Sequence, residues 1–163
     1  MSQISHIIVK VSQQKLYCCD DEEKVLFEYP VSTSSFGMGN KNGSFMTPLG
    51  EHSIAQKIGA DCARNEVFVG RVPQGVLEDL EREGRALPED IITSRILWLQ
   101  GMEPGVNHGE GIDSYLRYIY IHGTSEEEKI GTPASHGCVR MCNQDVIDLF
   151  NQVDEGCRVL IQE

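Results

Sequence analysis

Two short segments of the chain hold the residue types that acyl transfer needs. His122 lies in the segment 120–124 (YIHGT), and sixteen residues later Cys138 lies in the segment 135–140 (SHGCVR). A thiol becomes a strong nucleophile when a base takes its proton, and imidazole is the side chain best suited to that task near neutral pH. The pattern predicts nucleophilic catalysis through a thioester, with Cys138 as the nucleophile.

The residues beside the thiol predict how the reaction is assisted. The backbone N–H groups of Gly137 and Cys138 are expected to form the oxyanion hole, and a glycine at 137 allows backbone angles that a Cβ would obstruct. Arg140 follows two positions after Cys138, so in extended backbone its side chain emerges on the same side. Two interpretations of Arg140 stay open: it binds a substrate carboxylate, or it pairs with a neighbouring Asp or Glu and fixes the loop.

The remaining polar residues of the two segments are given supporting roles. His136 is expected to line the substrate site or to brace the loop by hydrogen bonding, rather than to act as the base. Ser135 and Thr124 are predicted to orient the two histidines. Tyr120, or Tyr118, is a candidate phenolic donor.

A zinc site is the alternative to nucleophilic chemistry. Its four ligands would be His122, His136, Cys138 and Cys142, with a spacing that zinc tolerates between the cysteines. Structural zinc sites favour paired Cys-x-x-Cys hooks, which this chain lacks. The sequence therefore predicts no metal and no cofactor.

The two segments together resemble the signature of the L,D-transpeptidase catalytic domain, the YkuD family. The segments 29–34 (YPVSTS) and 47–54 (TPLGEHSI) and the closing part of the chain resemble the family as well. The resemblance implies a thiolate that attacks the peptide bond between an L-configured centre, usually of meso-diaminopimelate, and D-alanine. It implies His122 as the base for Cys138, peptidoglycan stem peptides or muropeptides as substrates, and acylation by carbapenems.

Composition narrows the class of protein further. A chain of 163 residues fits a single catalytic domain spanning 1–163. A net charge of −11 makes nucleic acid and anionic membrane surfaces poor partners. The chain has six cysteines, but it is too large to need disulfides and its start lacks a secretory signal. We therefore expect reduced thiols and a cytoplasmic protein. The alternative is a periplasmic protein whose export segment is not included.

Short β-favouring runs dominate the pattern and predict a mainly β, L,D-transpeptidase-like sandwich or barrel, with one helix beside the catalytic loop and a short helical insertion. Cys18 and Cys19 are expected on opposite faces of a strand. The segment 37–43 is expected to be a flexible loop over the sheet, and the glycines in 101–114 make a mobile lid plausible. Strands are predicted at 4–11, 14–18, 24–31, 51–58, 66–71, 91–99, 115–122 and 157–162, and helices at 74–83, ended by Gly84, and from the capping residue Asn143 to Val153.

The thioester can be resolved in two ways. Water gives an L,D-carboxypeptidase, and an amine gives a cross-link or an exchanged D-amino acid. A cytoplasmic enzyme would meet muropeptides returned for recycling, so the expected function is an L,D-carboxypeptidase that removes the terminal D-alanine from tetrapeptide stems. An L,D-transpeptidase is the alternative, and a muropeptide-binding protein without catalysis is the second alternative.

Overall fold

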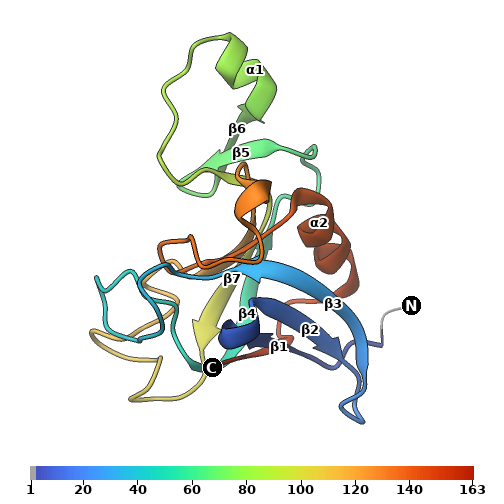
Figure 1. Ribbon diagram of the computed structural model, residues 1–163, viewed down its shortest axis with the longest axis vertical. Coiled ribbons are helices and arrows are strands. Elements are labelled where there is room, and N and C mark those ends of the chain that lie inside the picture. Colours follow the sequence, from blue (N-terminus) through green and yellow to red (C-terminus); the bar gives the residue numbers. More distant parts are fainter. Residues whose placement is uncertain (1–2) are drawn as a thin grey trace.

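The computed structural model describes residues 3–163, and most of its elements are strands (Figure 1). Within these residues ten strands form one sheet in the order β4-β10-β1-β2-β3-β9-β8-β7-β5-β6. The predicted mainly β fold is confirmed. The strands are β1 (His6–Lys10), β2 (Lys15–Cys19), β3 (Val25–Ser32), β4 (Gly50–Ile58), β5 (Glu66–Val69), β6 (Val72–Val76), β7 (Ile92–Gly101), β8 (Tyr120–Thr124), β9 (Val139–Met141) and β10 (Arg158–Gln162), and the helices are α1 (Leu77–Arg82) and α2 (Asn143–Gln152).

The sheet curls until β4 also pairs with β7. The series from β4 to β7 therefore forms a ring of eight strands, from which β5 and β6 extend. The ring is uneven, because β3 and β9 share only two residue pairs, Val31 with Met141 and Ser32 with Arg140. The sheet is barrel-like without being a regular barrel, and its shortest strand, β9, carries the end of the cysteine motif.

The N-terminal strands form the predicted antiparallel meander, since β1 pairs with β2 and β2 with β3. The chain reverses at Gln14, which adopts a left-handed backbone with φ 50°. As expected, Cys18 and Cys19 lie on opposite faces of β2: Cys18 packs in the hydrophobic interior, and Cys19 lines the other face beside Ile8 and Tyr17. Both side chains are nevertheless buried, at 0% and 2% exposure.

The main hydrophobic core lies between the curled sheet and α2, and α2 contributes Val146, Leu149 and Phe150 to it. The predicted capping role of Asn143 is wrong. Cys142 is the N-cap residue, and the first N–H of the helix, that of Asn143, donates to the Glu127 carboxylate at 2.7 Å. The Asn143 side chain instead points inward, where its Oδ1 accepts hydrogen bonds from Thr93 and Ser94 on β7. The helix is thereby fixed to the sheet beside β8.

Residues 59–91, which contain β5, β6 and α1 and are called the insertion lobe below, project from the rest of the molecule (Figure 1). The predicted strand 66–71 ends at Val69, and a turn at Gly70 and Arg71 leads into β6. The predicted helix 74–83 is wrong at its start. Gly75 pairs with Val67 and has φ 125°, which no helix allows, so α1 begins only at Leu77. As predicted, Gly84 follows its end, with φ 70°.

The predicted strand 115–122 is wrong in its first half. The N–H of Tyr118 donates to the carbonyl of Tyr115, and Tyr118 has φ 58°, so the chain turns there and β8 begins at Tyr120. The segment 101–114 is held by the buried Asn107, whose amide donates to the carbonyls of Leu49 and Glu51 at 3.1 and 3.0 Å. This contact joins the segment to the start of β4.

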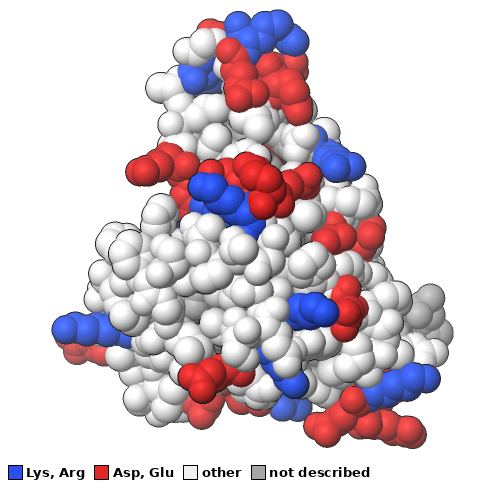
Figure 2. All heavy atoms as spheres, in the orientation of Figure 1, with Lys and Arg blue, Asp and Glu red and all other residues white. Residues whose placement is uncertain are grey.

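Acidic side chains are spread over the face drawn in Figure 2, with Lys and Arg among them and a wide uncharged area between. That face has no continuous basic stripe of the kind that follows a nucleic-acid backbone. Among residues 3–163, no helix is both long and apolar enough to cross a bilayer.

Candidate active site

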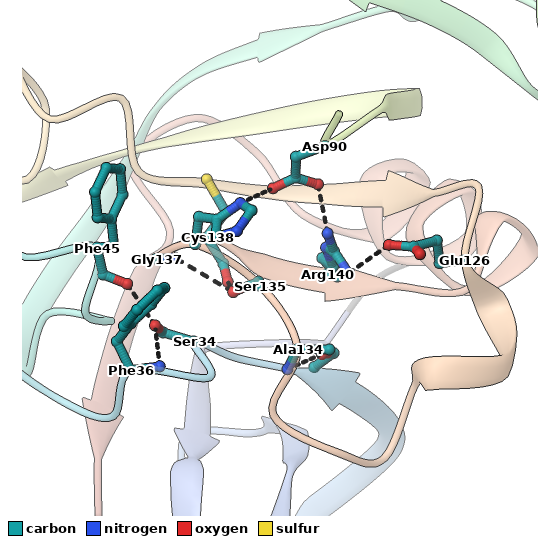
Figure 3. A network of polar contacts seen from close by, with 12 residues as sticks. Ser34, Phe36, Phe45, Asp90, Glu126, Ala134, Ser135, Gly137, Cys138 and Arg140 are labelled. Atoms are coloured by element: carbon teal, nitrogen blue, oxygen red, sulfur yellow. Dashed lines mark hydrogen bonds and ion pairs between the residues drawn. The ribbon is translucent and has the colours of Figure 1, made fainter. Parts of the chain in front are cut away.

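The two predicted motifs lie on neighbouring strands. β8 and β9 run parallel, with Ile121 paired to Val139 and His122 paired to Arg140. Residues 139–141, expected as an extended loop, form β9. Because alternate positions of a strand share a face, Cys138 and His122 project from the same face of the sheet, offset by one pleat. Figure 3 shows the Cys138 sulfur and Asp90 on one side of the loop that leads into β9.

The Cys138 thiol is held by two backbone groups of the preceding turn. Its Sγ donates to the carbonyl of Tyr118 at 3.4 Å and accepts from the N–H of Tyr120 at 3.3 Å. Burial raises the pKa of Cys138 to about 12; the nearby Asp90 also raises it, while the Tyr120 N–H and the positive charge of Arg140 act in the opposite direction. The resting cysteine is a neutral thiol.

His122 is fully buried, and its two ring nitrogens differ. Nδ1 lies 2.6 Å from the carbonyl oxygen of Gly123, so Nδ1 carries the proton and Nε2 carries the free lone pair. Nε2 is buried without a hydrogen-bond partner among the described residues. Burial lowers the pKa of His122. The site therefore holds a neutral imidazole with an unused acceptor nitrogen, on the face of the sheet that also carries the thiol.

Arg140 lies almost completely buried, at 2% exposure, between two carboxylates. Its guanidinium contacts Asp90 at 2.6 Å and Glu126 at 3.2 Å (Figure 3). The other oxygen of Asp90 lies 3.5 Å from Nδ1 of His136, which is half-exposed. Of the two interpretations of Arg140, the geometry matches pairing with neighbouring acids. His136 and Arg140 are joined through one carboxylate that the sequence analysis did not single out.

The loop before Cys138 is built on Gly137 and Ser135. Gly137 has φ 128°, a conformation that L side chains rarely adopt. Its N–H, a predicted oxyanion donor, is directed at the Ser135 hydroxyl at 3.3 Å, and that hydroxyl donates to the carbonyl of Cys138 at 2.6 Å. The Thr47 hydroxyl holds the Gly137 carbonyl at 3.0 Å. Ser135 is thus bonded to the loop backbone rather than to a histidine.

Thr124 and Tyr120 have partners that sequence reasoning did not supply. The Thr124 hydroxyl accepts from the N–H of Glu126 at 3.0 Å, so it shapes the turn after β8. The Tyr120 ring is buried against Trp98, and its hydroxyl accepts from Arg71 at 3.0 Å. A phenolic role for Tyr120 toward substrate would require Arg71 to share that hydroxyl.

Three residues of the site were missed: Asp90, Glu126 and Arg71. Asp90 and Arg71 lie in the insertion lobe, 32 and 51 residues before His122 by number, and no local spacing connects them to the motifs. Only the charge of Arg140 could have indicated the two carboxylates from sequence, since a buried guanidinium needs carboxylates beside it. Within residues 3–163, no three His, Cys, Asp or Glu side chains are grouped so that they could hold a metal ion.

A mainly β fold with a cysteine loop on one strand and a buried histidine on the next defines a class of β-domain with a cysteine–histidine site. Comparison with protein families identifies that class: residues 4–161 match YkuD, the L,D-transpeptidase catalytic domain, and the chain belongs to this family.

Individual relatives agree with this assignment. The putative L,D-transpeptidase YqjB of Bacillus subtilis is 49% identical over 47 residues, which are 29% of this chain and 27% of that protein. The probable L,D-transpeptidase YcfS of Escherichia coli is 23% identical over 156 residues, which are 95% of this chain and 43% of that protein.

Solved structures show the same fold. An L,D-transpeptidase from Mycobacterium smegmatis superimposes with a TM-score of 0.56 at 15% identity, covering 99% of this chain and 59% of that one. The L,D-transpeptidase LdtMt1 in complex with imipenem gives a TM-score of 0.57 at 15% identity, covering 98% and 59%. In each of these four comparisons the match covers less than two thirds of the other protein.

Proposed function

We propose that this chain is a cysteine-dependent acyl-transfer enzyme acting on peptidoglycan stem peptides, with Cys138 as nucleophile and His122 as base. One observation carries the proposal. The buried, unpartnered Nε2 of His122 lies on the face of β8 and β9 from which the Cys138 thiol also projects. A buried acceptor without a hydrogen-bond partner destabilises a fold. In the proposed reaction this nitrogen accepts the proton of the thiol.

The reaction follows from the protonation states. As Sγ of Cys138 bonds to the carbonyl carbon of the D-alanyl peptide bond, its proton passes to Nε2 of His122. The tetrahedral intermediate collapses when its C–N bond breaks, and the leaving amine of D-alanine takes the proton from His122. A thioester on Cys138 remains. Water then attacks the thioester carbonyl and His122 takes a proton from it; the C–S bond breaks, and His122 returns the proton to the leaving sulfur, which restores the thiol and the neutral imidazole.

The developing oxyanion needs donors that point at it, and the N–H groups of Gly137 and Cys138 are our candidates. The long contact of 3.3 Å from the Gly137 N–H to the Ser135 hydroxyl is weak, so it can yield to a charged oxygen. Ser135 would then keep its stronger bond to the Cys138 carbonyl and hold the loop in place.

The half-exposed His136 is our candidate for direct substrate contact. Arg140 would bind a substrate carboxylate only if Asp90 or Glu126 moved away, so its first contribution is to hold the loop. Thr124 and Tyr120 act behind the site, through the turn after β8 and the wall beside the thiol.

We propose hydrolysis as the completing step, which makes the protein an L,D-carboxypeptidase in the cytoplasmic recycling of muropeptides. The test is incubation with a disaccharide tetrapeptide and analysis of the products by mass spectrometry. Tripeptide plus free D-alanine is the expected result. Dimers, or exchange of an added D-amino acid, would replace hydrolysis by transpeptidation. Persistent binding with no product, the same for wild type and Cys138→Ala, would indicate a binding protein and overturn the enzymatic proposal.

Carbapenem acylation is an independent test of the thiol. Attack by Sγ on the β-lactam carbonyl opens the ring by breaking its C–N bond, and the ring nitrogen takes the proton, so the whole mass of the drug stays on the protein. We expect this adduct on the peptide that contains Cys138 after incubation with imipenem. The other five cysteines are controls in the same spectrum. An unmodified Cys138 would count against an activated site.

A further inference from the structure

Arg71 adopts a left-handed backbone conformation, which is unfavourable for a residue with a Cβ. It forms, with Gly70, the two-residue turn between β5 and β6, and the two residues have φ 67° and 55°. Turns of this kind, with positive φ at both central residues, prefer Asn and Gly. A left-handed backbone costs a residue with a Cβ about 1 kcal/mol. The β5–β6 turn thus carries a long cation although glycine would suit its backbone better.

The Arg71 side chain lies on aromatic rings behind the thiol. Its guanidinium carbon is 4.9 Å from the centroid of the Trp98 ring and 5.0 Å from that of Tyr118. Its Nη1 donates to the Tyr120 hydroxyl at 3.0 Å. Guanidinium–ring contacts of this kind are worth about 0.5–1 kcal/mol each at exposed sites. Tyr118 also has a left-handed backbone, with φ 58°, so two unfavourable backbone conformations face each other across this contact.

Tyr118 and Tyr120 also hydrogen-bond to the Cys138 thiol through their backbone groups. The Cys138 Sγ donates to the Tyr118 carbonyl and accepts from the Tyr120 N–H. Arg71 therefore contacts the side chains of the two residues whose backbone groups bond to the sulfur.

Asp90 makes the second contact between the lobe and the site. Its two carboxylate oxygens lie 2.6 Å from Arg140 and 3.5 Å from His136, the residues on the other side of Cys138 (Figure 3). The lobe is anchored to the rest of the sheet, because β5 pairs with β7 at Phe68 and Phe68 is buried at 2% exposure. The insertion lobe thus contacts both sides of Cys138. One wall of the Cys138 site, Tyr118 and Tyr120, is contacted by Arg71, and the other wall, His136 and Arg140, is contacted by Asp90.

We propose that Arg71 and Asp90 are positioning residues, which clamp the insertion lobe onto the two walls of the Cys138 site and hold the thiol in the orientation from which it attacks. This inference rests on the proposed acyl-transfer function. Misplacing a reacting atom by about 1 Å can cost about 100-fold in rate. Releasing either contact should lower kcat by roughly 10- to 100-fold and change KM much less.

Two substitutions separate the clamp from a purely structural role. Arg71→Gly removes the cation and at the same time relieves the unfavourable backbone conformation, so a turn that only needed the right geometry would improve. Asp90→Asn keeps the size of the side chain and removes its charge. Their matched controls are Arg85→Ala and Glu89→Gln, which change exposed residues of the same lobe. Arg71→Lys, which keeps the charge but not the planar group, should recover part of the lost rate.

The measurements are kcat and KM with a tetrapeptide muropeptide, and the rate at which iodoacetamide alkylates Cys138, read on its peptide by mass spectrometry. We expect kcat to fall and alkylation to change at least threefold in Arg71→Gly and Asp90→Asn, with both controls unchanged. Wild-type rates in both variants would overturn the clamp. If the wild type turns over no muropeptide, the proposed function fails, and alkylation alone decides the clamp. If either variant does not fold, as judged by circular dichroism, Arg71→Lys and Asp90→Glu decide by the same two measurements.

Discussion

Burial moves the pKa values of the two central side chains apart. It raises the pKa of Cys138 to about 12 and lowers the pKa of His122, so the proton stays on sulfur at neutral pH. A thiolate–imidazolium pair would need the reverse order. The resting pair of Cys138 and His122 is therefore uncharged, and in the proposed mechanism the thiol gives up its proton only as its bond to the substrate forms.

This protonation state predicts how the Cys138 alkylation rate depends on pH. Because the thiolate fraction of a group with a pKa of about 12 grows tenfold per pH unit well below that value, the rate should keep rising between pH 8 and 11. A free cysteine would level off above its ordinary pKa of about 8.5. The measurement is iodoacetamide labelling of the Cys138 peptide at a series of pH values. A plateau below pH 8 would show an ion pair instead.

Turnover should have its acid limit below the ordinary imidazole range. The base must be neutral, and burial lowers the pKa of His122, so the neutral form persists to lower pH than in a free histidine. We expect kcat/KM of the tetrapeptide reaction to hold as the pH falls through the pKa of a free histidine, about 6.5, and to fall only in more acidic solution. A limb centred above pH 7 would assign the base to another group.

Substitution at the two cysteines of the motif should give opposite results. Cys138→Ala should abolish turnover and leave the melting temperature close to that of the wild type, because the thiol makes only long contacts to backbone. Cys142→Ser should have a mild effect on turnover, since Cys142 is the N-cap of α2 and makes no side-chain capping bond. Loss of activity in Cys142→Ser would instead favour a role for that sulfur in the site.

At the scale of elements, Gly123 and Asn143 explain how β8 is fixed in place. A Cβ at Gly123 would lie 2.5 Å from the carbonyl oxygen of Thr93 and 2.6 Å from Oδ1 of Asn143. The glycine after His122 is thus required for close packing of β8 on β7 and α2. Asn143 fills the other side of that contact, where its amide also donates to the Thr124 carbonyl at 3.0 Å.

Asn143→Ala should therefore destabilise the fold strongly. The substitution removes the acceptor of the Thr93 and Ser94 hydroxyls and leaves both buried without it. Each unsatisfied buried group costs about 1–3 kcal/mol, so the free energy of unfolding should fall by about 3 kcal/mol. Chemical denaturation measures it. The neighbouring Gln144→Ala, on the exposed face of α2, should change stability by less than about 0.5 kcal/mol.

Sequence predicted the elements whose pattern is local and missed those that depend on distant partners. The β1–β3 meander and α2 follow from short-range alternation and helical spacing. The predicted helix wrongly includes residues 74–76, the second half of β6, because the pairing of Gly75 with Val67 outweighs the apolar spacing that begins there. In the site, Cys138 and His122 were found from their motif. Asp90 was not, because it reaches Arg140 across 50 positions of sequence and nothing in the segment 84–91 distinguishes it.

At the scale of the whole molecule, the ring of strands and the insertion lobe have different tasks. The ring sets β8 beside β9 and so fixes which face the thiol and the imidazole share. The lobe adds Arg71 and Asp90 from one side, and the segment 37–47 is tied down from the other by Arg117, which donates to the Met46 carbonyl at 2.6 Å. The site is thus formed where three parts of the chain meet.

A second buried histidine predicts that the whole fold is sensitive to acid. His52 lies on β4 with Nδ1 2.9 Å from the Gly50 carbonyl and Nε2 2.9 Å from the Ser114 hydroxyl, which joins β4 to the segment before β8. Burial lowers its pKa to about 4, although Glu103 and Glu51 nearby act in the opposite direction. The unfolded chain has a histidine pKa of about 6.5 and binds the proton first.

Stability contributed by neutral His52 is therefore present above pH 6.5 and is lost as the pH falls from there toward 4. Over that window the free energy of unfolding should decrease by about 3 kcal/mol from this residue alone. Urea denaturation at intervals between pH 7 and 4 measures the slope, and His52→Gln, whose amide offers one donor and one acceptor, should flatten it. Because the buried His122 acts in the same direction, His122→Gln isolates the share of His52. A slope that His52→Gln leaves unchanged would assign the acid sensitivity to other groups.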